Sequence, residues 1–361
     1  MQIGLVGRAL RMPCQSPHPR YAKPAFASSC PLRAAPLHFP TKYNCCPMAA
    51  VKSETTISDS KVATRNPFGI HALVFSGTWS PEDARRAISG AATAGFDIIE
   101  IPMTGRRIDT ALTKRLLKEY GITPTCSLGL TADTDISSEN SGVVKRGEEV
   151  LELALETAAE IGSSFVGGVL YSMLGKYDQG PTERGLENSA KVLRRICERA
   201  AKLNIKIGLE PCNRYETNVV NTVKEMRNFI KRFGEPDNCF VHFDAYHVHI
   251  EENYEQAVED GGDRIGYVHV GDSQRGYLGS GNVDFGRIFR SLAKVNYEGP
   301  LVFESFSKKV VDKELTRALA IWREMWSDSE DLAEKAHGFL VREWNRAVQD
   351  VKGASADKIP R

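Results

Sequence analysis

Ile207-Gly208-Leu209-Glu210 is an apolar run that ends in a carboxylate. Three later segments repeat the pattern, each ending an apolar run with a residue that can bind a metal: Val241-His242-Phe243-Asp244, Gly266-Tyr267-Val268-His269 and Leu301-Val302-Phe303-Glu304. A parallel barrel presents the carboxyl ends of all its strands at one face, so residues distant in sequence meet there. Carboxylates that hold a metal ion can also transfer protons. The four segments therefore predict a metal-dependent enzyme on a barrel of parallel strands.

The rest of the chain alternates strand-like and helix-like segments with short connections. Eight buried runs are expected to be strands: residues 68–75, 97–103, 123–130, 164–172, 206–212, 239–248, 265–272 and 299–306. Amphipathic helices are expected between them, such as 145–161. An additional helix, about 329–348, is expected to cover the barrel or to form an oligomer contact. The pattern predicts an α/β fold, a single (β/α)8 TIM barrel with an extra C-terminal helix, over residues 66–350.

Helix boundaries can also be placed from the sequence. Ser80, Pro81 and Asp83 form a start signal, with a capping serine, a proline at the first helical position and an acid three residues after the cap. Four glycines stand where helices are expected to stop: Gly95, Gly121, Gly162 and Gly234.

Residues 1–53 contain no Asp or Glu. They hold seven basic residues: Arg8, Arg11, Arg20, Lys23, Arg33, Lys42 and Lys52. A basic, acid-free segment without a continuous apolar core is typical of an organelle transit peptide and not of a secretory signal. We therefore expect a disordered leader that directs the protein to the chloroplast or another plastid, with the mitochondrion or cytoplasm as the alternative address. A plain disordered tail, or a start at Met48, also fits the composition.

Charge and hydropathy exclude two classes of partner. Without the seven leader residues, 40 of the 47 basic residues face 46 acidic ones, a net charge of about −6, which disfavours a nucleic-acid partner. No apolar run approaches the roughly 20 residues that cross a bilayer, so no membrane partner is expected. The cysteines outside the leader form no Cys-x-x-Cys pair and are expected to be reduced, buried thiols: Cys126, Cys197, Cys212 and Cys239.

Two of the strand-end segments resemble a known family. Gly208-Leu209-Glu210-Pro211-Cys212-Asn213-Arg214-Tyr215-Glu216 and Phe243-Asp244-Ala245-Tyr246-His247-Val248-His249-Ile250-Glu251-Glu252 are similar to the ketose 3-epimerases. This family comprises D-tagatose, D-psicose (allulose) and L-ribulose 3-epimerases within the xylose isomerase-like barrels. The resemblance extends from Phe68 to about Trp326. Further matches are Phe96-Asp97-Ile98-Ile99-Glu100-Ile101, Gly167-Gly168-Val169-Leu170-Tyr171-Ser172, Gly266-Tyr267-Val268-His269-Val270-Gly271-Asp272 and Phe303-Glu304-Ser305-Phe306.

The resemblance implies a set of ligands for one divalent ion, which comprises Glu210, Asp244, His269 and Glu304. Three carboxylates and an imidazole suit Mn²⁺, which we expect, and also Co²⁺ or Mg²⁺. The resemblance further implies that three residues bind the hydroxyl and carbonyl oxygens of the ketose: Glu216, His247 and Arg275. The expected partner is thus a small-molecule ketose, and we expect a homo-oligomer, either a dimer or a tetramer.

The expected proton transfer also follows from the chemistry of the reaction itself. Inverting a carbon next to a ketone requires proton removal from one face and delivery to the other, through an enediolate whose charge needs a nearby cation. Glu210 and Glu304 are expected to exchange the acid and base roles. Together with the resemblance, this implies an isomerase that epimerises carbon 3 of a ketose. An aldose-ketose or hydroxypyruvate isomerase-like enzyme remains the alternative, because it moves a proton between carbons 1 and 2 with the same residues. An endonuclease IV-like enzyme needs several zinc ions and a basic face, which the net charge disfavours.

Several positions in the expected sugar pocket depart from the psicose epimerases. Leu174 and His71 stand where those enzymes carry aromatic residues, and Ser127-Leu128-Gly129-Leu130 replaces a His-Gly pair. These departures bring the sequence closer to the L-ribulose branch, so we expect ketopentoses to rival ketohexoses as substrates. Trp79 is expected to form an apolar wall for the sugar, with a core or lid position as its alternative.

Other residues of the expected site also have structural alternatives. Glu216 could form a loop salt bridge with Arg214, His247 could be an ordinary buried histidine, and Arg275 could be a surface charge. The glycine-rich run 275–282 could instead cradle a phosphate through backbone amides. The remaining histidines near the site are expected to be structural or exposed and not ligands: His242 and His249.

Overall fold

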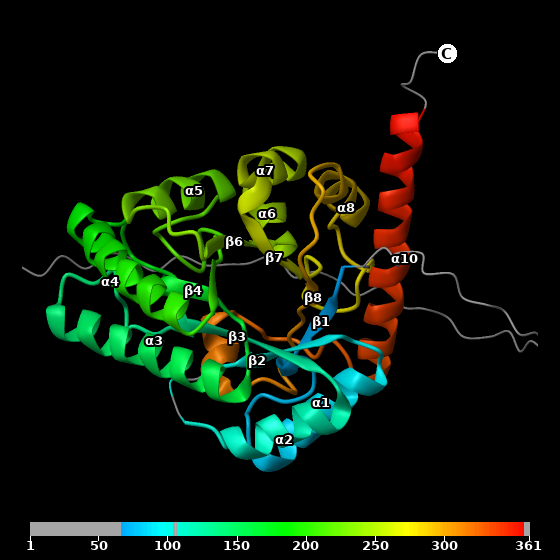
Figure 1. Cartoon of the computed structure of the whole chain (residues 1–361), viewed down its shortest axis with the longest axis horizontal. Helices are drawn as coiled ribbons and strands as arrows, with labels where there is room; N and C mark the ends of the chain where they lie inside the picture. Colours follow the sequence, from blue (N-terminus) through cyan, green and yellow to red (C-terminus); the bar gives the residue numbers. More distant parts are fainter. Residues whose placement is uncertain (1–65, 104, 106, 357–361) are drawn as a thin grey trace, which may run out of the picture. The chain divides into compact units, whose positions relative to one another are not determined.

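The computed structural model describes residues 66–103, 105 and 107–356, which lie in one compact unit. Within them, eight parallel strands close into a barrel in chain order, with the last strand paired to the first (Figure 1). The strands are β1 (Phe68–His71), β2 (Ile98–Pro102), β3 (Thr123–Leu130), β4 (Phe165–Met173), β5 (Lys206–Leu209), β6 (Cys239–Asp244), β7 (Ile265–Val270) and β8 (Leu301–Phe303). The prediction of a TIM barrel is confirmed, whereas the predicted leader at 1–53 lies outside the described residues.

Helices surround the barrel and fill the connections between strands (Figure 1). They are η1 (Ala72–Val74), α1 (Pro81–Thr93), α2 (Thr110–Tyr120), α3 (Ser141–Ile161), α4 (Glu183–Lys202), α5 (Val223–Arg232), α6 (Ala245–Glu251), α7 (Tyr254–Gly261), η2 (Gly262–Arg264), α8 (Phe285–Lys294), α9 (Lys313–Ala318) and α10 (Ser329–Ala356). None of these helices is both long and apolar enough to cross a membrane.

Five predicted strands, 68–75, 206–212, 239–248, 265–272 and 299–306, extend at least two residues beyond the observed strand ends. In two of them a side chain at the strand end starts a helix. The run 239–248 is a strand only to Asp244, whose carboxylate accepts a hydrogen bond from the Tyr246 backbone and caps α6. The run 68–75 stops at His71, whose Nδ1 accepts from the Leu73 backbone at 3.1 Å and caps η1. Apolar residues continue on the buried side of these helices, so periodicity alone could not place the boundary.

The predicted helix boundaries agree closely with the structure. Ser80 and Asp83 form a reciprocal capping box at α1, with Pro81 in the first helical position. Gly121 and Gly162 cap α2 and α3 at φ values of 67° and 84°, a left-handed conformation that favours glycine. Gly95 and Gly234 follow the caps of α1 and α5 by one residue, at φ values of 90° and 98°.

Aromatic side chains fill the interior of the barrel. Phe165 stacks on Tyr267 with the ring centroids 4.2 Å apart, and Val302 completes this cluster. Gly167 and Gly208 leave the space for the phenyl ring, because a Cβ on either would lie 2.6 or 2.3 Å from Phe165 atoms. The interior is therefore a packed core, and polar residues further along the strands lie at the carboxyl end.

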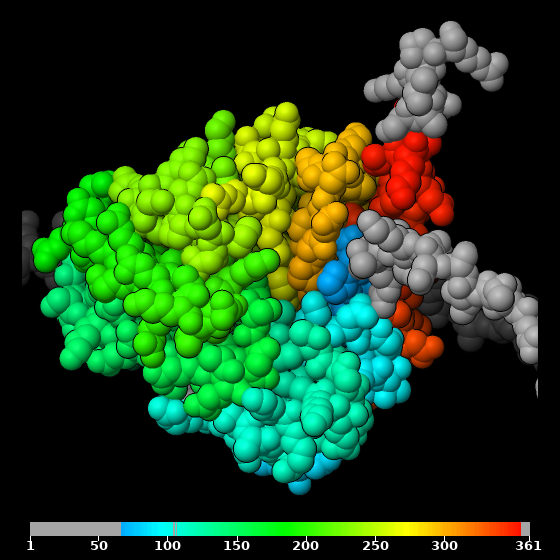
Figure 2. Space-filling view, viewed as in Figure 1, coloured from blue at the N-terminus to red at the C-terminus, as the bar shows by residue number. Residues whose placement is uncertain are grey.

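The last helix, α10, covers the barrel between its first and last helices. It contacts α8, α1, β1 and β8 (Figure 1). The buried face of α10 comprises Leu332, Ala333, Ala336, Leu340, Trp344 and Ala347. In the space-filling view its red surface adjoins the orange surface of α8 (Figure 2). The predicted extra helix is thus confirmed as a barrel cover, and it extends beyond the predicted end at 348 to Ala356.

Candidate active site

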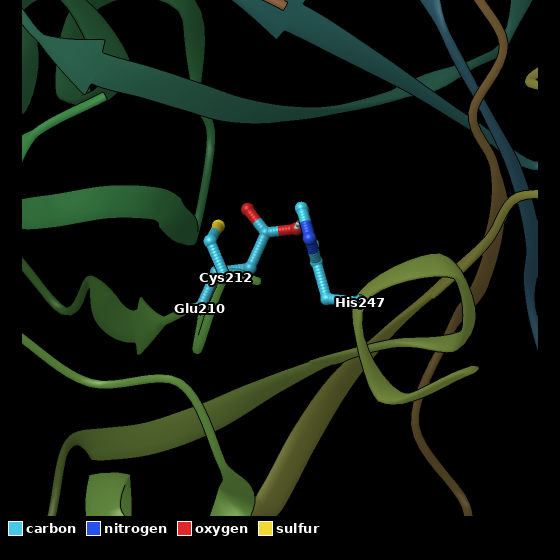
Figure 3. A group of neighbouring side chains, drawn as sticks. All are labelled: Glu210, Cys212 and His247. Atoms are coloured by element: carbon cyan, nitrogen blue, oxygen red, sulfur yellow. Dashed lines mark ion pairs between the residues drawn. The ribbon is translucent and has the colours of Figure 1, made fainter. Parts of the chain in front are cut away.

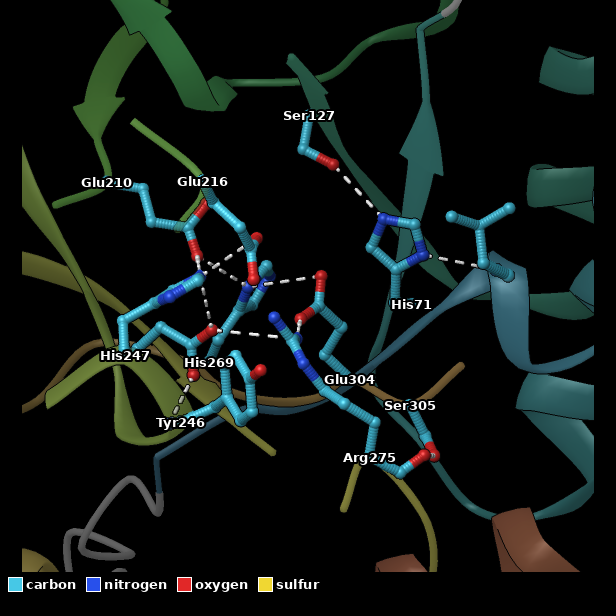
Figure 4. Close-up of polar contacts among 12 residues, drawn as sticks. His71, Ser127, Glu210, Glu216, Tyr246, His247, His269, Arg275, Glu304 and Ser305 are labelled. Carbon is cyan, nitrogen blue, oxygen red and sulfur yellow. Dashed lines mark hydrogen bonds and ion pairs between the residues drawn. The ribbon is translucent and has the colours of Figure 1, made fainter. Parts of the chain in front are cut away.

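The four predicted metal ligands meet at the carboxyl ends of β5 to β8. Glu210 and Glu304 directly follow β5 and β8, while Asp244 ends β6 and His269 lies on β7. His269 Nδ1 lies 3.5 Å from Glu210 Oε1 and 3.6 Å from Glu304 Oε1 (Figure 4). Ligand atoms of Asp244, His269 and Glu304 all lie within 4.8 Å of one another. The structure therefore brings together the residues that the sequence placed at four separate strand ends.

The polar atoms of this group fit a divalent cation. Burial raises the pKa of Glu210 and raises the pKa of Asp244 well above its ordinary value. Asp244 Oδ2 and His269 Nδ1 are buried without a hydrogen-bond partner in the described part of the chain. Such orphaned atoms cost free energy unless another group satisfies them. Carboxylate oxygens with one imidazole nitrogen are ligands that Mn²⁺, Co²⁺ or Mg²⁺ accepts.

His247 and Glu216 lie beside this group and are oriented by Asn213. The Asn213 amide donates to Glu216 Oε1 at 3.0 Å and contacts His247 Nδ1 at 2.8 Å, and its backbone N–H also donates to Nδ1 at 3.1 Å. His247 therefore carries its proton on Nε2, which lies 3.5 Å from Asp244 Oδ2. Burial, together with the nearby Arg275, lowers the pKa of His247 well below its ordinary value, which favours the neutral ring. Both side chains are thus fixed at the site as predicted.

Glu216 does not form the loop salt bridge that was its structural alternative. Arg214 pairs instead with Glu251, at 2.6 Å between Nη2 and Oε2. Burial raises the pKa of Glu216, a residue that is 6% exposed.

Arg275 is a buried cation of the site and not a surface charge. It is 9% exposed, it forms an ion pair and hydrogen bond with Glu304, and its Nη1 lies 3.7 Å from Asp244 Oδ2. Its guanidinium carbon stands 3.8 Å from the centre of the Tyr246 ring and 4.9 Å from that of Phe306. Burial alone would lower the pKa of Arg275, but Glu304 and Asp244 raise it, so the side chain stays charged.

The glycine-rich loop that carries Arg275 is folded around the buried carboxylate of Asp272. This carboxylate accepts backbone hydrogen bonds from Ser273, Gly279, Gly281 and Val283. These amides are therefore occupied, and the structure does not support the alternative that the loop cradles a phosphate. The Arg275 backbone has a φ of 58°, and its carbonyl accepts from the Ser305 hydroxyl at 2.6 Å. Such a strained conformation persists when surrounding contacts determine it.

The three residues predicted for the sugar pocket occupy different surroundings. His71 ends β1 and lies to one side of the ligand group, with Nε2 at 3.2 Å from Ser127 Oγ (Figure 4). Leu174 follows β4 and packs directly on Gly129, where a Cβ would lie 2.6 Å from Leu174 Cδ2. Trp79 is half-buried against the main core, and its indole nitrogen donates to Thr113 on α2 at 3.1 Å. These contacts are also those of a core residue, and the part of Trp79 in sugar binding stays a prediction.

Cys212 and His247 form a second possible ligand group with Glu210 (Figure 3). His247 Nε2 lies 3.9 Å from Glu210 Oε1. Burial raises the pKa of the Cys212 thiol well above its ordinary value, and metals bind the thiolate. This group is therefore a poorer metal site than the carboxylate cluster. Like Cys212, the other described cysteines are free and buried, as expected: Cys126, Cys197 and Cys239.

Sequence reasoning missed several residues that support the site. Glu100 was noticed only as part of a matching stretch, although an acid within the apolar strand 98–102 is itself a signal. Asn213 and Tyr246 carried no signal, because their roles depend on contacts with His247 and Arg275. His242 is fully buried and packs edge-on against His269, so it is not exposed. Its ligand atom also lies within 4.8 Å of those of Glu210 and His269, so this position could share a metal ion. His249 contacts the Tyr254 hydroxyl outside the ligand group.

Comparisons with known proteins agree with this geometry. Residues 88–341 match the family described as xylose isomerase-like TIM barrel. The chain is 46% identical over 282 residues to the L-ribulose 3-epimerase of Methylomonas sp. (strain DH-1), covering 78% of this chain and 98% of that protein. It is 42% identical to the ketose 3-epimerase of Arthrobacter globiformis, covering 75% and 94%. The crystal structure of the Methylomonas sp. D-allulose 3-epimerase in complex with D-allulose matches with a TM-score of 0.76 at 46% identity, covering 77% and 97%.

These comparisons also correct the predicted location. The relatives come from bacteria, which have no plastids, so the predicted chloroplast or plastid address is wrong. The composition of residues 1–53 resembles that of a transit peptide, but a basic, acid-free composition is not specific to targeting segments. The family match spans most of the chain, and the relatives that exceed 30% identity are covered over nearly their full length. The chain therefore belongs to the ketose 3-epimerases, within the xylose isomerase-like TIM barrel family.

Proposed function

We propose that this protein epimerises carbon 3 of a free ketose with the help of one divalent metal ion. The observation that carries the proposal is the convergence of Glu210, Asp244, His269 and Glu304 at the ends of four neighbouring strands, with orphaned buried atoms on two of them. We expect Mn²⁺, with Co²⁺ or Mg²⁺ as substitutes. The ion would polarise the ketose and offset the negative charge that develops on its oxygens.

The two glutamates are proposed as the acid and the base. They come from β5 and β8, and each places an oxygen within 3.6 Å of His269 Nδ1, so they approach the same centre from different strands. One would remove the proton at carbon 3, and the other would return a proton to the opposite face. The roles exchange with the direction of the reaction, because epimerisation is reversible.

Three further residues are proposed to hold the sugar. Glu216 offers carboxylate oxygens, and His247 offers an N–H on Nε2. Arg275 can donate to a ketose oxygen beside Glu304, since a guanidinium carries five N–H groups. Three other residues stay predicted substrate-binding residues: His71, Leu174 and Trp79. Of these, His71 contacts residues that surround the ligand group. A dimer or tetramer likewise stays a prediction.

A product screen tests the proposal. The purified protein with Mn²⁺ is incubated with free and phosphorylated ketopentoses and ketohexoses, and the products are separated by chromatography. We expect carbon-3 epimers of the free sugars. Accumulation of aldoses without epimers would replace the proposal with an aldose-ketose isomerase.

A further inference from the structure

Glu100 is a buried acidic residue that the proposed mechanism does not use. It lies on β2 between Ile99 and Ile101, and the residue is fully buried. In the described part of the chain its ion-pair partners are two histidines, His71 and His269. A buried carboxylate is costly unless it is paired and hydrogen-bonded. The partners that stabilise this buried carboxylate therefore indicate its role.

One oxygen of Glu100, Oε2, has hydrogen-bond partners, whereas Oε1 is buried without one in the described part of the chain. Oε2 accepts from the Tyr267 hydroxyl at 2.7 Å and lies 2.8 Å from His269 Nε2. Oε1 lies 3.5 Å from His71 Nε2. The Tyr267 hydroxyl is in turn 2.7 Å from the Thr125 hydroxyl, so this carboxylate links β2 with β3 and β7. Burial would raise the pKa of Glu100, but the nearby His269 and His71 hold it well below its ordinary value.

This arrangement fixes the orientation of His269. A ring nitrogen that donates to a carboxylate carries the proton, which leaves the lone pair on the other nitrogen. His269 Nε2 faces Glu100, so Nδ1 is left to face Glu210 and Glu304 at 3.5 and 3.6 Å. A carboxylate behind a histidine ligand fixes its tautomer and makes the ligand more basic.

We propose that Glu100 is a positioning residue that tunes metal affinity by accepting the Nε2–H of His269, so that Nδ1 can bind the divalent ion. This inference rests on the proposed metal site. His71 takes part in the same support: its Nδ1 accepts the Leu73 backbone N–H, so its proton lies on Nε2, toward Ser127 and Glu100. A purely structural role for Glu100, as a link between strands, makes a different prediction.

The test compares Mn²⁺ binding by the metal-stripped full-length protein and two variants. Glu100→Gln keeps the size of the side chain and removes the charge. Tyr267→Phe removes the other hydrogen bond to the same oxygen, while it keeps the carboxylate and the ring stacked on Phe165. The Mn²⁺ dissociation constant is measured by competition with a fluorescent chelator. Glu100→Gln should raise it about 10- to 100-fold, and Tyr267→Phe should raise it much less.

Melting of the metal-free proteins separates the two roles. A structural role alone lowers the melting temperature of metal-free Glu100→Gln without changing Mn²⁺ affinity, and that result would overturn the inference. Equal losses of affinity in both variants would overturn it too. If Glu100→Gln does not fold, Glu100→Asp keeps the charge but withdraws it by one methylene, and an unchanged Mn²⁺ affinity in that variant counts against the inference.

A spectrum gives a second readout. The visible absorption bands of bound Co²⁺ should differ between the wild type and Glu100→Gln, because the donor strength of His269 changes. Identical spectra would contradict the inference. If the wild type binds neither Mn²⁺ nor Co²⁺, the proposed metal dependence fails. If the wild type binds both ions and the Glu100 variants bind them equally well, the metal site stands and the role of Glu100 is wrong.

Discussion

Glu210 and Glu304 both follow barrel strands, yet their surroundings differ. The Glu304 carboxylate is bonded to Arg275, which stays charged. The Glu210 carboxylate lies near His269 and His247, and burial raises its pKa. The backbone carbonyl of Glu210 accepts a hydrogen bond from the Tyr171 hydroxyl at 2.9 Å, which fixes the strand end and leaves the carboxylate free. The two residues are thus held by different contacts at a shared centre.

Replacing either glutamate by glutamine should remove a proton-transfer group. Glu210→Gln and Glu304→Gln should each lower kcat by at least about a hundredfold at saturating Mn²⁺, the usual scale for general acid-base groups. Steady-state kinetics of both variants provide the measurement. Glu183→Gln is a matched control, because Glu183 is an exposed partner of Arg232 on the outer helices. Near-normal kcat in either site variant would show that this residue is not one of the two bases.

Substrate chain length should respond to position 174. Leu174 packs on Gly129 at the end of β3, so a larger ring there must project differently and alter the adjoining space. We expect Leu174→Trp to shift the ratio of kcat/KM toward ketohexoses by about tenfold, on the scale of one hydrophobic contact. The volume-conserving Leu174→Met variant should leave the ratio near that of the wild type. An unchanged ratio for ribulose and psicose in the tryptophan variant would exclude this position from sugar recognition.

At the scale of the helices and strands, the sequence predicted the periodic elements well. All eight strands were found because fully buried parallel strands are continuous apolar runs. Strand ends at Asp244 and His71 were missed, since each depends on a side chain that folds back to cap a helix. The ligand set could be predicted because each ligand stands at the end of such an apolar run. Glu100 and Asn213 could not, because they act through partners that are far away in sequence. The periodicity of apolar residues does not predict contacts between residues that are distant in sequence.

Two adjacent glutamates at the end of α6 should respond to pH in different ways. Burial raises the pKa of Glu252 to about 7, and its carboxylate accepts the Val223 backbone N–H at the start of α5. A raised pKa in the folded state contributes stability below the unfolded pKa, and this contribution is lost as pH rises toward 7. Glu252→Gln should therefore gain stability relative to the wild type between pH 5 and pH 8, by on the order of 1 kcal/mol because the group is partly exposed.

Glu251 provides the matched control for this measurement. Burial would raise its pKa, but hydrogen bonds from Arg214 lower it. A lowered pKa contributes stability above the unfolded pKa and is lost only as pH falls below it. Glu251→Gln should thus show a nearly constant loss of stability from pH 5 to pH 8 in thermal melts. If both variants follow the same pH dependence, the raised pKa of Glu252 is not the cause.

At the scale of the whole molecule, the proposed metal site joins the carboxyl ends of four consecutive strands of the barrel. The ligands belong to β5, β6, β7 and β8, and α10 packs against β1 and β8 beside them. A cation bound by Glu210, Asp244, His269 and Glu304 would neutralise carboxylates whose mutual repulsion opposes folding. The stability of the barrel should therefore depend on metal concentration.

Removal of the metal should lower both activity and melting temperature. A ligand that binds only the folded state stabilises it by about 2.7 kcal/mol at a concentration of 100 times its dissociation constant. Dialysis against a chelator should therefore abolish epimerisation and lower the melting temperature, and added Mn²⁺ or Co²⁺ should restore both. The melting temperature should rise continuously with the logarithm of Mn²⁺ concentration above the dissociation constant, as mass action requires.

An Asp244→Asn variant should melt nearly independently of Mn²⁺, since it lacks one ligand charge. Full activity in a preparation shown by elemental analysis to be free of divalent metals would contradict the metal-dependent mechanism.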